Sequence, residues 1–399
     1  MRNQTEQQAS ARRLYYLLGF TVALILYGST YPWDFRGDFR EFALAGNPLR
    51  LLFSTWAFSW SRWVFRDLTI NVGLYLPLGV LGFLALRRSF SKAVSIAGAL
   101  VGGAALSTSI EILQIFETSR SSSAVDVAAN TAGTALGILL GHTYREKIGA
   151  WASARVTDWS ARARGAVALL VAWAAYQIFP LFPALSTTRL RLGLSAMLGA
   201  GAFSGTEFLA ACGECAGVAA LVASLGGSGR TLGVVLLLVP ARLLIAGRTL
   251  HGAELLAAPA AWLLWTGILS RRAGKIAWAG GLVVLSIVVR GLAPLRFSAS
   301  PLAFSWIPFA AALSVEYSTA APVLLRKAFV YGAALWLLTA AGWSRVRAAA
   351  FLIVLLAAIE AVQVFLPPHV PEVTDPLLAL LLAILLKLLE SGGRANVSD

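Results

Sequence analysis

Long apolar stretches, separated by short polar segments, run through most of the chain. A membrane-spanning helix needs about 20 mainly apolar residues, and about 12 stretches approach this length. Their apolar residues are continuous and do not alternate with polar ones, which favours helices over the strands of a barrel. The predicted spans are Leu14–Thr30, Leu68–Leu86, Ala93–Phe116, Ala124–His142, Gly165–Leu181, Ser195–Leu225, Thr231–Gly247, Ala253–Leu269, Ile276–Val289, Pro322–Ala341, Val346–Leu366 and Pro376–Leu389.

The composition agrees with this pattern. Hydrophobic residues make up 58% of the 399 residues and charged residues only 13%, whereas soluble proteins carry about 25% charged residues. Since a backbone in lipid must satisfy its own hydrogen bonds, the predicted fold class is all-α: a polytopic membrane bundle of about 12 transmembrane helices. The stretch Ser195–Leu225 is too long for one straight crossing, so we expect a break at Gly205.

The net charge of +14 comes from basic residues that lie between the spans. This placement is typical of cytoplasmic loops and of contact with anionic lipid, and it argues against nucleic acid as a partner. Placing the N-terminus inside puts Arg12, Arg87, Arg88, Arg271 and Arg272 in the cytoplasm. The sequence therefore predicts a multi-pass protein of a bacterial cytoplasmic (inner) membrane, with both termini cytoplasmic.

Polar residues near the spans recur at fixed spacings. Three acids that open an apolar span each have a basic residue six positions earlier, and another polar residue six positions before that. These sets are Gln114–Arg120–Asp126, Arg242–Arg248–Glu254 and Gln363–His369–Asp375. The spacing predicts three four-helix repeats, in residues 1–150, 151–275 and 276–399. In the middle repeat, Arg242 and Glu254 are expected to form an ion pair in place of the glutamine and aspartate.

The first repeat carries the most complete polar set. Residues four or three apart share a helix face, which gives three pairs on consecutive helices: Asp67 with Asn71, Glu111 with Gln114, and Asp126 with Asn130. A carboxylate inside a span, such as Glu111, is costly in lipid and indicates function. The hypothesis is therefore a site near the outer surface, with Glu111 and Asp126 catalytic and Asp67, Asn71, Gln114, Arg120 and Asn130 binding.

Structural explanations compete with this hypothesis. Ser123 is a suitable cap for the start of a helix, and Asp126 would then be an acid in the first turn, where it stabilises the helix electrostatically. The pair Gly133 and Gly137 matches a helix-packing motif, and polar pairs can simply fasten membrane helices together.

Other chemistry has weaker support. Cys212 and Cys215 form a single CxxC, and the three histidines fall in different repeats, so no metal site is predicted. The sequence has no signature that identifies a cofactor. Glu207 and Glu214 share one face of the sixth span and are candidates to line a polar cavity.

The motifs of the first repeat resemble the VanZ-like family. The resemblance rests on D-x-x-x-N-x-x-x-x-x-P-x-G at Asp67–Gly79, I-E-x-x-Q at Ile110–Gln114, Arg120, and D-x-x-x-N-x-x-G at Asp126–Gly133. It covers about residues 66–141. The third repeat keeps Glu360, Gln363 and Asp375, but has His369 and Ala379 where the family pattern has arginine and asparagine.

The resemblance implies a role at the cell envelope, because the family's named member is associated with low-level resistance to the glycopeptide teicoplanin. The expected partner is a membrane lipid or a lipid-linked envelope precursor, with Glu111 as the acid–base group and Arg120 binding an anionic headgroup. Two alternatives remain open: a transporter, since transporters are often built from internal repeats, and a non-catalytic scaffold for envelope enzymes.

Overall fold

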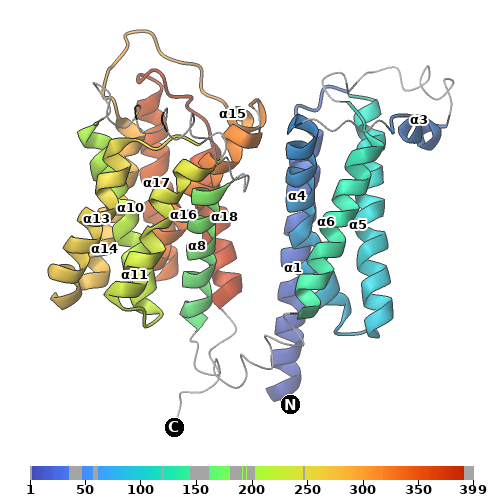
Figure 1. Cartoon of the computed structure of the whole chain (residues 1–399), viewed down its shortest axis with the longest axis horizontal. Coiled ribbons are helices and arrows are strands. Elements are labelled where there is room, and N and C mark those ends of the chain that lie inside the picture. Colours follow the sequence, from blue (N-terminus) through green and yellow to red (C-terminus); the bar gives the residue numbers. More distant parts are fainter. Residues whose placement is uncertain are drawn as a thin grey trace. The chain divides into compact units, whose positions relative to one another are not determined.

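A computed structural model shows the described residues mainly as helices (Figure 1). The predicted all-α fold class is confirmed. The structure describes residues 2–35, 47–56, 62–117, 121–143, 161–179, 191, 195, 203–245, 248–315 and 317–390.

The chain forms two compact units, Met1–Asp158 and Trp159–Asp399. The predicted boundary at residue 150 lies close to the end of unit 1. The predicted boundary between residues 275 and 276 lies inside unit 2, so the second and third predicted repeats share one compact body. The division of the chain into three repeats stays a prediction.

The described residues of unit 1 form four long helices and one short one, which Figure 1 shows side by side with their connections. Three glycines bring α4 and α6 into close contact: Gly79 faces the backbone of Thr134, Gly133 faces that of Val72, and Gly137 faces that of Leu76. The glycine pair of the sequence is therefore a packing element, as small residues at helix interfaces usually are. The helices are α1 (Arg2–Thr30), α3 (Pro48–Ser54), α4 (Arg62–Leu86), α5 (Lys92–Ile115) and α6 (Ala124–Thr143).

Unit 2 has more helices, several of them short. Its order is α8 (Ala161–Ile178), α10 (Gly205–Ser224), α11 (Gly229–Leu236), α12 (Leu238–Ala241), η2 (Arg242–Leu244), α13 (Gly252–Gly267), η3 (Leu269–Arg271), α14 (Lys275–Leu292), α15 (Ala310–Leu313), α16 (Tyr317–Ala340), α17 (Arg345–Gln363) and α18 (Thr374–Glu390). Helix α10 begins at Gly205, where the sequence predicts a break.

The predicted span Thr231–Gly247 is wrong as a single helix. The structure divides it into α11, α12 and η2. The cause is Pro240, which has no N–H to donate and whose ring clashes with the carbonyl four residues earlier. That carbonyl belongs to Leu236, the last residue of α11.

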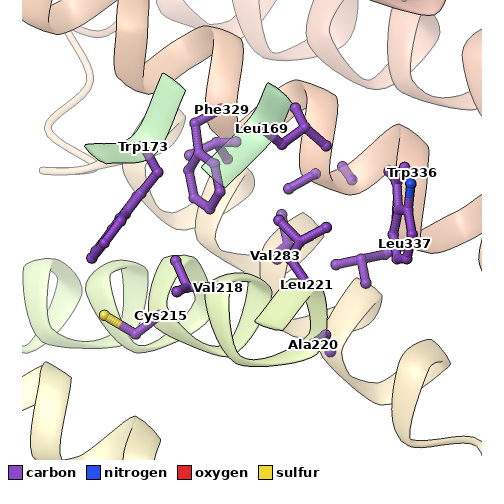
Figure 2. Packing of buried hydrophobic residues seen from close by; sticks show 14 of the residues in the cluster. Leu169, Trp173, Cys215, Val218, Ala220, Leu221, Val283, Phe329, Trp336 and Leu337 are labelled. Carbon is purple, nitrogen blue, oxygen red and sulfur yellow. The ribbon is translucent and has the colours of Figure 1, made fainter. Parts of the chain in front are cut away.

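Helices of the second and third predicted repeats pack on each other reciprocally. Helix α8, from the first predicted span of the second repeat, packs on α16, from the second predicted span of the third repeat. In the same way α14, from the first span of the third repeat, packs on α10, from the second span of the second repeat. Figure 2 shows the resulting core, where Trp173 of α8 lies beside Phe329 of α16 with ring centroids 6.4 Å apart. Leu221 of α10 and Val283 of α14 are fully buried in the same cluster. The apolar core of unit 2 therefore lies between the two repeats.

Eight of the helices in the described residues are long and apolar enough to cross a membrane. They are Asp67–Leu86, Lys92–Ile115, Ala124–Thr143, Gly205–Ser224, Gly252–Arg271, Lys275–Leu292, Thr319–Ala340 and Arg345–Gln363. The apolar part of α1, Leu14–Thr30, is shorter, and α18 has 17 residues. The protein is an all-α membrane bundle, while the predicted number of 12 spans is not confirmed.

Candidate functional site

The polar residues predicted in unit 1 connect its helices. The side-chain amide Nδ2 of Asn71 on α4 donates to Oδ1 of Asp126 on α6, at 2.8 Å. Nδ2 of Asn130, one turn further along α6, donates to Oγ of Ser107 on α5, at 2.9 Å. Both bonds join neighbouring helices at buried or half-buried positions. They satisfy groups that would otherwise be costly in lipid.

Glu111 and Gln114 lie on the last turns of α5. Glu111 is 4% exposed, and its Oε2 accepts a hydrogen bond from the backbone N–H of Ser123, just before α6, at 2.8 Å. Nε2 of Gln114 donates to the backbone carbonyl of Ser29, near the end of α1, at 2.7 Å. These two side chains therefore fix the end of α5 against both α6 and α1.

Asp67 and Arg120 are the other two predicted site residues of unit 1. Asp67 is exposed on α4 and lies close enough to Asp126 to interact with it electrostatically. Arg120 lies outside the described residues, so the expected contact between Arg120 and Glu111 stays a prediction.

The third predicted repeat makes the same hydrogen bonds. Oε2 of Glu360 accepts from the backbone N–H of Glu372 at 2.8 Å. Glu372 lies twelve residues after Glu360, just as Ser123 lies twelve residues after Glu111. Nε2 of Gln363 donates to the carbonyl of Gly291, near the end of α14, at 2.8 Å. The carboxylate and the amide thus have equivalent backbone partners in the two repeats.

The two repeats differ around the aspartate that opens the last helix. Asp375 accepts from Nζ of Lys327 and from the hydroxyl of Tyr331, each at 2.6 Å, whereas Asp126 pairs with a neutral amide. His369, in the position of Arg120, places its Nε2 2.6 Å from the carbonyl of Ala293. The third repeat is therefore more strongly charged than the first.

The middle repeat contains the expected ion pair. Nη2 of Arg242 lies 3.1 Å from Oε1 of Glu254, and both side chains are almost fully buried. Nη2 of Arg248 donates to the carbonyl of Tyr176 at 3.1 Å. The guanidiniums of Arg242 and Arg248 lie 5.1 and 5.0 Å from the centroid of the Tyr176 ring. The polar residues of this repeat are bonded mainly to one another.

A cavity of about 450 Å³ lies in unit 2. Charged residues from both repeats line it, and apolar residues of α16 and α17 complete its wall. The charged lining residues are Glu214, Arg290, Arg326, Lys327, Glu360, Glu372 and Asp375. Glu214 thus lines the cavity, as the sequence suggested, whereas Glu207 lies in the first turn of α10 and is not a lining residue.

The sequence interpretation missed Arg290, Arg326 and Lys327. The predicted span Pro322–Ala341 leaves Arg326 and Lys327 near the start of a helix, but α16 begins at Tyr317, so they lie in its third turn. The available signal was their charge inside an apolar stretch, since ionisable residues within a span usually serve a function. Nζ of Lys327 lies 2.6 Å from Asp375, and Nη2 of Arg290 lies 3.2 Å from Glu214.

The fold and these polar sites define a polytopic membrane protein with buried charged groups between its helices. Residues 14–145 match the family model described as VanZ/LLP1. The resemblance inferred from the motifs of unit 1 is therefore confirmed, and these residues form a VanZ-like unit. No curated protein matches the chain, and no solved structure matches it.

Proposed function

We propose that this protein acts at the cell envelope of a bacterium and binds a membrane lipid or a lipid-linked envelope precursor. The observation that carries the proposal is the charged cavity inside a bundle of membrane-spanning helices. Its volume of about 450 Å³ falls within the range of small-molecule sites, about 300–1,000 Å³. Charged groups at this depth are retained for function more often than for stability.

The two VanZ-like polar sets have different parts in this proposal. In unit 1, Glu111 and Asp126 are acid–base candidates, each already held by a hydrogen bond. Their counterparts Glu360 and Asp375 line the cavity. Ligand binding in unit 2 is therefore the better supported activity, and the chemistry of unit 1 remains a hypothesis that rests on its motifs.

A transporter is the second candidate function. The reciprocal packing of α8 on α16 and of α14 on α10 favours it, because transporters frequently place a substrate site between two internal repeats. Transport by purified protein in liposomes would separate the two candidates. Uptake of an envelope precursor across the bilayer supports the transporter, whereas binding without uptake supports an envelope protein with a lipid ligand.

The orientation proposed from the basic loops can be tested with single cysteines. Ser121 follows α5, Pro368 follows α17, and Ser89 follows α4; all three are exposed. In a variant that lacks Cys212 and Cys215, a membrane-impermeant maleimide is expected to label S121C and P368C in intact cells. It should label S89C only after the cells are opened. The reverse pattern would place both termini outside.

Blocking the cavity is expected to abolish the function in cells. Val323 lines the cavity and is 45% exposed, so Val323→Trp should obstruct it with little damage to the core. Cells that express only this variant should have the same pool of lipid-linked envelope precursors, and the same susceptibility to teicoplanin, as cells in which the gene is deleted.

The matched control is Val234→Trp. Val234 is an exposed valine of α11, 68% exposed, and does not line the cavity. This variant should behave as the wild type. Normal precursor pools with V323W, at normal protein levels, would show that the cavity has no part in the function.

A further inference from the structure

Four arginines gather at the centre of unit 2. Arg290 and Arg326 flank Glu214, with Nη2 of Arg290 at 3.2 Å and Nε of Arg326 at 3.8 Å from the same carboxylate oxygen. Behind them, Arg242 and Arg248 share Glu254 and the ring of Tyr176. Within the described part of the chain, four guanidiniums therefore face two carboxylates. Of these four, Arg290 and Arg326 line the cavity beside Glu214, so this part of the lining carries two positive charges and one negative charge.

Several donors of this cluster are unused. Nε of Arg242, Nε of Arg248 and Nε of Arg290 are buried and have no hydrogen-bond partner among the described residues. A buried donor without a partner costs about 1–3 kcal/mol, and more when it is charged. Arg290 lines the cavity and its side chain is 23% exposed, so an anion in the cavity can reach the exposed part of this side chain and offset the positive charge.

Another part of the cavity lining is acidic. Glu360, Glu372 and Asp375 line it, with Lys327 as the cation paired with Asp375. One oxygen of Glu360 accepts from a backbone N–H, and one oxygen of Glu372 accepts from the N–H of Ala311 at 3.2 Å. Glu360 also hydrogen-bonds to the side chain of Asp375, so Glu372 is the carboxylate that suits a ligand with hydroxyl or ammonium donors, since a carboxylate accepts at both oxygens.

The cavity reaches the surface between apolar side chains. Val315, Val323 and Val370 line it and are 49%, 45% and 59% exposed. Val323 lies within the candidate span Thr319–Ala340, so this part of the rim belongs to a segment apolar enough to cross the membrane. Leu356 and Ile359 of α17 form an apolar inner wall. A ligand that enters here comes from the membrane, and its acyl chain can lie against these residues.

We propose that the cavity of unit 2 binds, from the side of the membrane, a lipid headgroup that combines a phosphate with hydroxyl or ammonium donors. Arg290 and Arg326 hold the phosphate, and Glu372 accepts from the donors. The inference rests on the proposed function, which requires only that an amphiphile occupies the cavity. It adds the chemical class of the headgroup and the residues that recognise each part of it.

The test uses the full-length protein purified in detergent and four probes. Dioctanoyl phosphatidylglycerol carries phosphate and hydroxyls, dioctanoyl phosphatidylcholine carries phosphate without donors, dioctanoylglycerol lacks phosphate, and inorganic phosphate lacks the chains. We expect the phosphatidylglycerol to bind at least about tenfold more tightly than each of the other three probes, about 1.4 kcal/mol. Binding would be measured by native mass spectrometry and by the shift in unfolding temperature.

Variants then test the arginines that line the cavity. Arg290→Gln and Arg326→Gln should each weaken phosphatidylglycerol binding at least about tenfold, the cost of a lost charged hydrogen bond, and Arg290→Lys should restore part of it. The matched control is Arg345→Gln, which removes an arginine of the same unit that pairs with Glu390 at 2.6 Å and does not line the cavity.

The outcomes separate the inference from the proposed function. Equal binding of dioctanoylglycerol and phosphatidylglycerol would overturn the inference and leave an amphiphile site in place. Binding of inorganic phosphate as tight as that of the lipid would identify a soluble anion as the ligand and overturn the lateral entry. If no lipid binds the wild-type protein, both the inference and the proposed function fail. These comparisons use wild-type protein, so they hold even if an arginine variant does not fold.

Discussion

Replacing Arg242 with methionine is expected to destabilise unit 2 by about 3–5 kcal/mol, which is the cost of removing one partner of a buried ion pair. Arg242 is 5% exposed and places two of its nitrogens within 3.2 Å of Glu254. Without the guanidinium, the Glu254 carboxylate stays buried in a membrane bundle with its main counter-charge removed. The measurement is equilibrium unfolding of purified protein in mixed detergent micelles.

The double variant Arg242→Met with Glu254→Leu tests the cause. Apolar residues of similar volume in place of a buried ion pair are often neutral or stabilising, so this variant should recover most of the lost stability. Arg230→Met is the control, because Arg230 is exposed at the start of α11 and should change stability by no more than about 0.5 kcal/mol. A double variant as unstable as R242M would show that the loss comes from packing and not from the unpaired charge.

Replacing Gly79 with alanine is expected to separate α4 from α6 in unit 1. A Cβ atom at this position would overlap the backbone carbonyl of Thr134, and a backbone group cannot rotate away as a side chain can. Overpacking of this kind costs about 1–3 kcal/mol and occasionally more. Hydrogen–deuterium exchange should be faster in both Arg62–Leu86 and Ala124–Thr143, and the protein should unfold at a lower temperature.

Gly73 provides a control on the same helix. Nothing lies within 4 Å of a Cβ atom built there. Gly73→Ala should therefore leave exchange unchanged, or stabilise the helix by about 0.5–1 kcal/mol, since alanine is the better helix residue. Unchanged exchange in G79A would mean that the α4–α6 contact is not as tight as the structure shows.

The sequence predicted the positions of the polar residues better than their partners. Glu111 and Glu360 occupy equivalent places because their spacing to the next helix is the same. Their acceptor roles toward Ser123 and Glu372, however, use backbone N–H groups, and a backbone group has no residue type to mark it. The amides Gln114 and Gln363 likewise donate to carbonyls of an earlier helix, which only the folded packing reveals.

Most of the cavity lining escaped prediction for a related reason. The predicted span begins at Pro322, which leaves Arg326 and Lys327 near its edge, whereas α16 begins at Tyr317. The residues that face them across the cavity, such as Glu214, come from helices far away in sequence. Spacing within one repeat cannot indicate which residues meet when two repeats pack together.

The reciprocal packing of α8 on α16 and of α14 on α10 gives unit 2 the organisation of a dimer whose two subunits share one chain. The apolar core of unit 2 is built from helices of both halves, so each half completes the core of the other. The linkage of the two halves in one polypeptide fixes their stoichiometry at one to one. It also keeps Glu214 of one half beside Arg290 and Arg326 of the other in the lining of the cavity.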